Sequence, residues 1–514
     1  MRYEDYKQQC RDDRDRDILK TYERTGSKKE TGSALGMSET AVRRALNRIA
    51  EAEPAPEAEP SHHRHLPQTR RYVVTCAQNA TNPHPGFLAS LRQYCDHNDA
   101  ELVVVPMRYR NPTARMETAW GEKTEYWWHW TLAPYLCGER TELFPGVMLM
   151  GDIKIQPTAV NPLSGLQTIT GSKCGIFGHT KLAMDSVPTQ GTQLPKLLYT
   201  TGAVTKQNYS DSKAGKKGEF HHVLGALVVE QDEQGLFHIR NLNANSKGHF
   251  TDLGKRYGPD GVEDANPPAA FVMGDLHAIR ADEDNVKACH DILDTLKPRR
   301  LVLHDALDFQ SGSYHNTWFE RFLLRQQGKS DVAQELEVTC RMIDELASKA
   351  DTSIISSNHD EHLLKWLENH HNALDLENAI VYHELKLEML RSIRDTGDIP
   401  DPLEVASRGR IRNRLTFIKD GGLQVHGIEM GYHGDKGPNG AKGSVGAFDR
   451  IGVKTITGHS HGPAIVGGAY RAGTSSILDM GYNRGPSNWL HSHVLVNADG
   501  KRTHIHVIDG RWKA

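Results

Sequence analysis

The sequence has few cysteines, no long apolar run and almost no net charge. Its seven cysteines in 514 residues form no Cys-x-x-Cys pair, which argues against a zinc ribbon and a disulfide framework and favours a reducing, cytoplasmic location. No stretch approaches the roughly 18 consecutive apolar residues that span a bilayer, and the first residues lack a signal-peptide core, so we expect no membrane partner. The formal net charge of −3 excludes a chain-wide basic surface, so any nucleic-acid contact must be local.

A chain of this length is too long for one ordinary core, and shifts in composition predict its divisions. We expect a helix-turn-helix-like module over residues 1–50 and a Pro/Glu-rich linker over 51–70. An α/β accessory domain is expected over 71–265 and a second α/β domain over 266–514. No internal repeat is apparent in the sequence.

The helical module predicts a DNA contact. In its third expected helix, from Ser38 to about Ala50, apolar residues fall on one face at helical spacing. The outward-facing residues are Arg43, Arg44, Asn47 and Arg48. This layout is typical of the recognition helix of a helix-turn-helix, and DNA is the partner it predicts. An ordinary three-helix bundle or an oligomerisation module with solvated arginines is the alternative, which leaves open a homo-oligomer.

The accessory region opens with a βαβ pattern. Strands are expected over Tyr72–Cys76 and Glu101–Val105, with an amphipathic helix over Gly86–His97 between them. The loop after the first strand lacks the Gly-x-Gly-x-x-Gly phosphate fingerprint, so this region predicts no nucleotide site.

Polar motifs follow apolar runs in the second half of the chain. They are Gly274-Asp275-Leu-His277, His304-Asp305-Ala-Leu-Asp308, Ser357-Asn358-His359-Asp360, His433-Gly-Asp435 and Gly458-His459-Ser-His461. Four of these motifs come directly after apolar runs that read as strands, whereas the His433 motif follows its run more loosely. The carboxyl ends of parallel strands meet at one edge of a sheet. We therefore expect the motif side chains to converge on a single cleft.

This ordered series resembles the calcineurin-like metallophosphoesterases, whose pattern is Asp-x-His, Gly-Asp-x-x-Asp, Gly-Asn-His-Asp/Glu, His and Gly-His-x-His. The chain departs from that pattern with His304 and Ser357, each of which stands where the family usually has glycine. The resemblance implies a layered α/β metallophosphoesterase sandwich over 266–514. More widely, the layout is similar to bacteriophage early proteins of metallophosphoesterase type that are linked to host DNA degradation, which would place the chain in the host cytoplasm.

The resemblance implies a ligand set for two divalent ions. The residues carried over by position are Asp275, His277, Asp305, Asn358, His433, His459 and His461. Asp305 is shared by both ions in the family arrangement. Oxygen and nitrogen ligands without thiolate suit Mn²⁺ or Mg²⁺, with Fe or Zn as further options. Two cations that share a carboxylate make water between them acidic enough to attack a phosphoester at neutral pH.

Other residues complete the implied chemistry. His359 matches the family's general acid, and Asp308 matches the carboxylate that orients it. Lys436 and Lys442, in a glycine-rich loop that starts at a ligand, are either a clamp on a phosphate backbone or part of a plain connector. His304 and His315 are candidates for substrate or supporting contacts.

The sequence thus predicts a hydrolase, a two-metal phosphodiesterase acting as a DNase, because a tethered DNA-binding module would concentrate DNA around a diesterase. One alternative is a phosphomonoesterase acting on nucleotides or phosphoproteins. Another is a DNA-binding regulator on an inactive metallophosphoesterase scaffold.

Overall fold

The computed structural model describes residues 6, 13–51, 64–108, 128–190, 193–481 and 483–514. Most of the predicted linker, residues 52–63, therefore lies outside the described residues. Three helices form the N-terminal module and pack around one small apolar cluster: α2 (Asp13–Thr25), α3 (Lys28–Leu35) and α4 (Glu39–Glu51). Ser27 caps α3, and Gly36 closes it in the left-handed conformation that glycine adopts without strain. These three helices lie where the sequence predicts a helical module.

Two sheets lie side by side in the remainder of the chain. The strands of the four-stranded sheet, in spatial order, are β2 (Glu101–Met107), β1 (Arg71–Gln78), β8 (Gly225–Gln231) and β9 (Phe237–Asn243). Those of the six-stranded sheet are β16 (Leu415–Ile418), β15 (Asp351–Ile355), β14 (Arg300–His304), β13 (Ala270–Val272), β22 (Ser492–Val496) and β23 (Arg502–His506). β9 and β23 contact each other, which brings the two sheets together.

A ten-stranded sheet covers one face of both. Its strands, in spatial order, are β17 (Gln424–Val425), β18 (Ile428–Glu429), β19 (Lys454–Thr457), β21 (Ala469–Arg471), β20 (Ala464–Val466), β6 (Ala183–Val187), β7 (Lys196–Thr200), β5 (Cys174–Phe177), β4 (Val147–Met150) and β3 (Arg140–Phe144). One apolar core joins all three sheets, with Val74, Ile465 and Val272 among its residues. Strand side chains alternate between faces, so the neighbours of these residues point the other way, toward helices.

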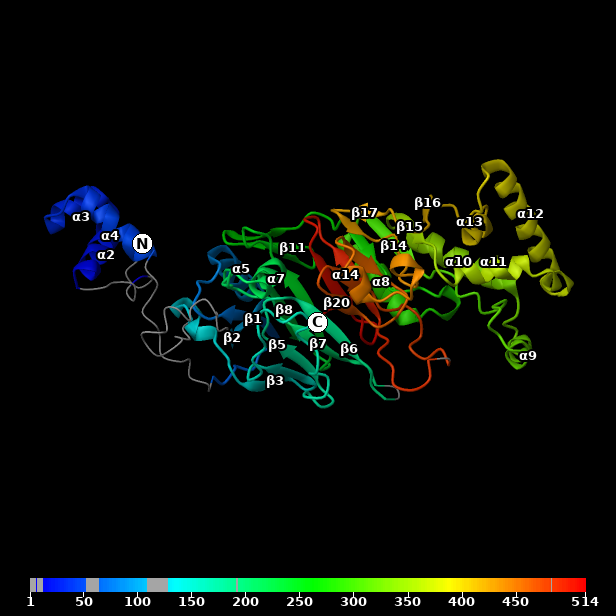
Figure 1. Cartoon of the computed structure of the whole chain (residues 1–514), viewed down its shortest axis with the longest axis horizontal. Coiled ribbons are helices and arrows are strands. Elements are labelled where there is room, and N and C mark those ends of the chain that lie inside the picture. The colour runs from blue at the N-terminus through cyan, green and yellow to red at the C-terminus, as the bar shows by residue number, and fades with distance from the viewer. Residues whose placement is uncertain (1–5, 7–12, 52–63, 109–127, 191–192, 482) are drawn as a thin grey trace.

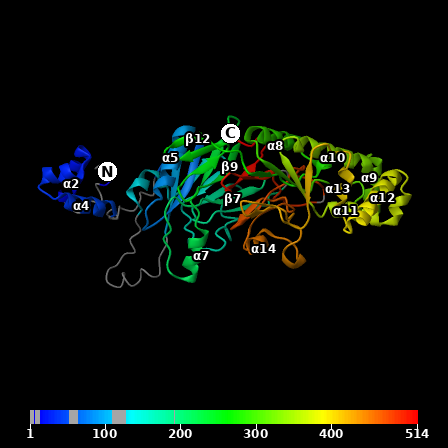
Figure 2. The same cartoon turned by 90° about the horizontal axis from the view of Figure 1, so that it is seen from above.

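Helices cover the opposite face of the two smaller sheets (Figure 2). α5 (Pro85–Asn98) packs on the four-stranded sheet, and α8 (Glu283–Leu296) and α10 (Val332–Ala347) pack on the six-stranded sheet. The remaining elements are α7 (Lys213–His221), β10 (Phe250–Asp252), β11 (Lys255–Gly258), β12 (Gly261–Asp264), α9 (Trp318–Gln326), α11 (Asp360–Glu368), α12 (Ala379–Thr396), α13 (Pro402–Ser407) and α14 (Val445–Asp449), with short 3₁₀ turns η3 (Trp130–Tyr135), η4 (Ala278–Arg280), η5 (His370–Leu374) and η6 (Pro438–Gly440). The chain is a layered, mixed α/β protein, with α9 and α12 at the end far from the N-terminal module (Figure 1). None of the helices among the described residues is long and apolar enough to cross a membrane.

The sheets contain a structural repeat that the sequence did not reveal. The order β3-β4-β5-β7-β6 in the N-terminal half matches β17-β18-β19-β21-β20 in the C-terminal half, and β2-β1-β8-β9 matches β14-β13-β22-β23. Each pair of neighbours is parallel or antiparallel in both halves alike. The structure therefore contains an internal repeat that is not apparent in the sequence.

One equivalent backbone hydrogen bond in each half shows which residues correspond. Cys76 N donates to Gly202 O at 3.2 Å, and Asp275 N donates to Gly473 O at 3.1 Å. α5 and α8 are both 14 residues long, and both end at a residue with left-handed backbone. The halves join where β6 pairs antiparallel with β20, its own counterpart. An approximate twofold axis therefore passes through the middle of the ten-stranded sheet.

The predicted boundary between residues 265 and 266 does not separate two independent folds. Strands from both sides of it share the ten-stranded sheet and the apolar core. Tyr199 and His506, from opposite sides of the boundary, are also hydrogen-bonded at 2.6 Å between the hydroxyl oxygen and Nε2. The two regions form one structural unit because each covers apolar surface of the other.

A buried ion cluster anchors the N-terminal half. Arg240 lies between Glu230 and Asp252, and its Nε is 2.6 Å from Asp252 Oδ1. We expect Arg240→Met to lower the free energy of unfolding by about 3–5 kcal/mol, because it leaves buried Asp252 without its cation and leaves buried Glu230 with Arg71 alone. Urea unfolding of both proteins would measure this loss. The matched control is Arg256→Met, which breaks an exposed pair with Glu263 and should cost at most about 1 kcal/mol. Equal losses in the two variants would contradict the expected role of the cluster.

The same cluster predicts a dependence of stability on pH. Burial opposes ionisation of Glu230, but Arg240 and Arg71 outweigh it and lower the pKa of Glu230 to about 2. A carboxyl group whose pKa falls on folding stabilises the fold above its unfolded pKa of roughly 4.3, and this contribution is lost as the pH falls toward the folded pKa. The gap in melting temperature between the wild type and Glu230→Gln should therefore narrow from pH 6 to pH 3, as measured by calorimetry. A constant gap would show that the Glu230 charge does not contribute.

Candidate metal centre

Five loops bring the seven predicted ligands together, each loop after a strand. Asp275 and His277 follow β13, Asp305 follows β14 and Asn358 follows β15. His433 follows β18, and His459 and His461 follow β19. β13, β14 and β15 run parallel, so their carboxyl ends reach one edge of the six-stranded sheet. We call these seven residues the seven-residue cluster.

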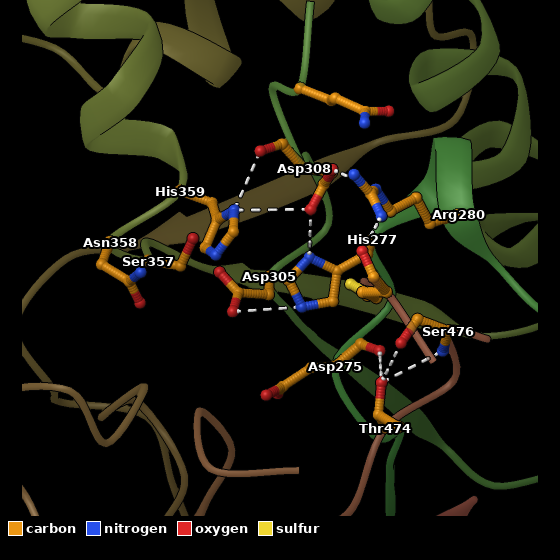
Figure 3. Close-up of polar contacts among 12 residues, drawn as sticks. Asp275, His277, Arg280, Asp305, Asp308, Ser357, Asn358, His359, Thr474 and Ser476 are labelled. Atoms are coloured by element: carbon orange, nitrogen blue, oxygen red, sulfur yellow. Dashed lines mark hydrogen bonds and ion pairs between the residues drawn. The ribbon is translucent and has the colours of Figure 1, made fainter. Parts of the chain in front are cut away.

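Four members of the cluster could hold one ion. Ligand atoms of Asp275, His277, Asp305 and His461 all lie within 4.8 Å of one another. The Nε2 atoms of His277 and His461 are 3.0 Å apart, and His461 Nε2 is 3.2 Å from Asp275 Oδ2. The Nδ1 atom of His277 lies 3.0 Å from Asp308 Oδ1, an acceptor, so Nδ1 carries the hydrogen and the Nε2 lone pair points into the cluster (Figure 3).

A second group shares Asp305. Ligand atoms of Asp305, His433 and His459 also lie within 4.8 Å of one another. Asn358 Oδ1 is 3.1 Å from both His433 Nε2 and His459 Nδ1, which adds a fourth ligand atom. Asp305 therefore stands where one carboxylate could contact two ions.

The backbone at the cluster is strained. His277, Asp305, His459 and His461 all have positive φ, at 43°, 44°, 73° and 56°. Residues other than glycine rarely adopt this conformation, at a cost on the order of 1–3 kcal/mol each, and they persist where surrounding structure enforces it. Such strain concentrates at ligand-binding sites.

Unpaired buried atoms test whether the cluster fits a metal. Both carboxylate oxygens of Asp275, Oδ1 of Asp305 and Nδ1 of His461 are buried without a hydrogen-bond partner. Buried polar atoms in this state are costly unless something satisfies them. Divalent cations would satisfy the carboxylate oxygens, and a donor set of oxygen and nitrogen suits hard or borderline ions. The residues fit a metal, whose identity the donor set does not specify.

The electrostatics of the cluster favour ionised aspartates. Burial opposes ionisation of Asp305, but His433, His359 and His277 outweigh it and hold the pKa of Asp305 well below its usual range. Burial likewise disfavours the charged form of His433, yet Asp305 raises the pKa of His433 to about 9. The site thus concentrates negative charge, which its histidines offset.

The predicted general acid and its partner lie at the rim of the cluster. His359 Nδ1 is 2.8 Å from the backbone carbonyl of Asp308 and 3.6 Å from Asp308 Oδ1. Asp308 therefore orients His359 through its carbonyl oxygen, while its carboxylate holds His277 at 3.0 Å. Sequence reasoning missed Arg280, whose Nε is 3.1 Å from Asp308 Oδ2. Its only signal was its place three residues after His277, on the η4 turn.

The two departures from the family pattern leave the cluster intact. Neither His304 nor Ser357 has the positive φ that would require glycine. His304 is fully buried with both ring nitrogens unpaired, burial lowers its pKa to about 4, and its ring lies 5.8 Å from that of His433. His304 therefore packs behind the cluster, and His315 lines a cleft beside His359.

The residues predicted to contact DNA differ in whether another side chain already pairs with them. Arg43, Arg44 and Asn47 are exposed on α4, whereas the Arg48 guanidinium pairs with buried Asp15. Lys442 is exposed, while Lys436 pairs with Glu361. Arg48 and Lys436 thus have protein partners that a phosphate contact would have to displace.

At several positions equivalent to the cluster, the N-terminal half has other residue types. By the hydrogen-bond correspondence, Cys76 stands for Asp275 and Gln78 for His277. After β5 the chain reads Gly178-His179-Thr-Lys181, where the sequence after β19 is Gly458-His459-Ser-His461. Lys181 Nζ donates to Val160 O at 3.0 Å instead of facing a ligand. Among the described residues, all groups of ligand-type side chains close enough to hold a metal lie in the C-terminal half.

The fold and the site together define a layered α/β protein with a buried histidine and aspartate cluster able to hold metal ions. No family model matches the sequence. The chain is 35% identical over 468 residues to Protein A1 of Escherichia phage T5, and the match covers 87% of this chain and 83% of Protein A1. The chain belongs to the family of this phage protein, whose name does not describe an activity.

Gly458 tests the cluster without removing a ligand. A Cβ atom at this position would lie 2.1 Å from Asp275 Oδ1, so Gly458→Ala must displace that carboxylate. We expect this variant to bind Mn²⁺ about 10- to 100-fold more weakly, the usual effect of disturbing the support of a ligand. Isothermal titration calorimetry on metal-stripped protein measures the change.

Gly446→Ala is the matched control, since a Cβ at Gly446 meets no atom within 4 Å. It should bind Mn²⁺ like the wild type. Unchanged affinity in Gly458→Ala would show that Asp275 is not a ligand.

Proposed function

We propose that this chain is a divalent-metal-dependent phosphodiesterase with a calcineurin-like metallophosphoesterase sandwich, and that its substrate is DNA. The observation that carries the proposal is the convergence of the seven-residue cluster on Asp305, which belongs to both groups of ligand atoms. The cluster is built on loops that follow strands of both the six-stranded sheet and the ten-stranded sheet.

The ligand roles follow from the two groups. Asp275, His277, Asp305 and His461 would hold one ion, and Asp305, Asn358, His433 and His459 the other, with Mn²⁺ or Mg²⁺ as the expected metal. Bound cations would supply an activated water and would stabilise negative charge on the phosphate oxygens. Asp308 would fix the ring of His277 and keep its Nε2 lone pair available.

His359 is placed to move a proton. Its Nδ1 faces a carbonyl oxygen, which only accepts, so Nδ1 carries a hydrogen and Nε2 is the atom left to exchange a proton with substrate. His359 is partly exposed and lines the cleft beside the cluster. Protonated His359 would donate from Nε2 to the leaving oxygen of the phosphodiester.

The N-terminal module supports DNA as the substrate. Its third helix, α4, buries Val42, Leu46 and Ile49 and presents Arg43, Arg44 and Asn47 to solvent. A recognition helix of this kind would raise the local DNA concentration around a tethered diesterase. The relation to a phage protein agrees with a role in an infected cell.

Hydrolysis of DNA by the purified protein tests the proposal. We expect Mn²⁺-dependent degradation of plasmid and linear DNA that EDTA abolishes. Asp305→Ala should reduce the rate to background, and His359→Ala should lower kcat about 10²- to 10⁴-fold, the usual contribution of a general acid. Gel assays with labelled DNA measure these rates.

His371→Ala, which changes an exposed histidine outside the cleft, is the matched control and should keep the wild-type rate. Equal DNA hydrolysis by the wild type and Asp305→Ala would overturn the mechanism. Release of free phosphate from nucleotides without cleavage of DNA would identify a phosphomonoesterase instead.

A further inference from the structure

Two clefts adjoin the metal cluster, and they meet at one loop. The first, of about 900 Å³, contains His359 and Asn358 and is closed on one side by α9; we call it the His359 cleft. The second, of about 830 Å³, contains Trp489, whose ring lies 4.1 Å from the ring of His461; we call it the Trp489 cleft. Gly481 and Arg484 line both clefts. The clefts thus adjoin each other; the first includes Asn358 of the cluster, and the second adjoins the cluster through Trp489, which packs on His461.

Each cleft is near the upper end of the roughly 300–1,000 Å³ range of small-molecule pockets. Two adjoining clefts of this size exceed the needs of one phosphomonoester. They suit a substrate that continues on both sides of the reacting phosphate, as a polynucleotide strand does.

Charged side chains of both signs line the clefts: the cations are Arg280 and Arg484, and the anions are Asp308, Glu320 and Asp479. Arg484 is exposed at the junction, and its Nε donates to Gly481 O at 3.2 Å, which holds the side chain against the loop. Arg280 donates to Met480 O at 2.9 Å from the same loop and also faces the His359 cleft. Arginine in such positions is the usual partner of a phosphate group. Arg484 on this loop therefore presents a guanidinium group where the clefts meet, whereas Arg280 lies on η4 and is paired with Asp308.

Aromatic rings line both clefts. In the His359 cleft, the centre of the His315 ring lies 4.0 Å from that of Tyr314, with the two rings tilted, and 5.2 Å from that of His362. In the Trp489 cleft, the indole of Trp489 provides a ring at the wall. Rings beside a positively charged groove are the common means of binding unpaired bases, because every base has a face that can stack. Bases in a duplex are already stacked on each other and cannot enter such concave sites without being flipped out.

We propose that the His359 cleft and the Trp489 cleft form one track for a single, unpaired DNA strand, with Arg484 on a phosphate at the junction and His315 stacked on a base. Cleavage of the bound strand rests on the proposed DNase activity, whereas binding of the strand does not. Base-paired DNA would have to open locally before cleavage.

Binding without metal tests the track independently of catalysis. In EDTA, with Arg43→Gln and Arg44→Gln introduced to remove the duplex contact proposed for α4, a fluorescein-labelled 12-nucleotide single strand should bind more tightly than the corresponding 12-base-pair duplex, as measured by fluorescence anisotropy. Arg484→Gln should weaken binding of the single strand and make the slope of log K against log salt less steep by about 0.7, the share of one phosphate contact in single strands. His315→Ala should weaken binding at least about fivefold, since it removes a stacking surface.

Arg450→Gln is the matched control, because Arg450 is an exposed arginine that lines neither cleft. It should leave both the affinity and the salt slope unchanged. Duplex binding as tight as single-strand binding, or unaltered affinity in both Arg484→Gln and His315→Ala, would overturn the track. Thermal melting of each variant checks that the fold is retained.

A kinetic comparison separates this inference from the proposed function. With Mn²⁺, Arg484→Gln should raise KM for the oligonucleotide by a larger factor than KM for bis(p-nitrophenyl) phosphate, a diester too small to fill the clefts. Equal factors would overturn the track while leaving the diesterase intact. A wild-type protein that hydrolyses neither substrate would refute the proposed function, and the binding measurements would still decide whether the track exists.

Discussion

The structure depends on the accumulation of buried negative charge at Asp275 and Asp305. Burying two ionised carboxylates costs free energy unless cations or hydrogen-bond donors surround them. Here imidazole rings surround them, and several buried ligand atoms still lack hydrogen-bond partners. The left-handed backbone at His277, Asp305 and His461 indicates that the loops accept strain to point these groups at one place. The parallel strands and the helices behind them supply the rigidity that enforces this geometry.

The internal repeat places that geometry in context. Both halves build the same arrangement of strands, yet the ligand-type groups close enough to hold a metal, among the described residues, lie in the C-terminal half. In the N-terminal half, Cys76 and Gln78 occupy the positions of Asp275 and His277, and Lys181 occupies that of His461. The N-terminal half therefore has the same strand arrangement without such a cluster among its described residues. The N-terminal half instead contributes sheet and core that the C-terminal half packs against.

Much of the site could be predicted from the sequence, because each ligand lies in a short motif directly after an apolar strand. The convergence of Asp275, Asp305 and Asn358 follows from parallel strands ending at one edge. The helix-turn-helix-like module and the helix now seen at α5 were also predictable, since both follow from helical spacing. The partners of Asp308 were not, because the choice between its carboxylate and its carbonyl depends on loop geometry. Arg280 was missed for the same reason.

The repeat and the shared sheet could not be predicted from the sequence, for a different reason. Buried strand positions accept many apolar residues, so two halves can keep the same hydrogen-bond pattern with little identity. Tyr199 and Tyr470 are among the few residues that coincide, and each contacts the opposite half, through His506 and Asn243. A boundary based on composition could not detect strands that cross it.

The pairing of β6 with β20 bears on whether the sheet can associate with other chains. An uncovered strand offers a row of free amide and carbonyl groups to any neighbouring chain. Here β6 of one half pairs with β20 of the other, so neither strand is an exposed edge of the ten-stranded sheet. The N-terminal half thus covers, with β6, the edge of β20 in the half that carries the ligand cluster.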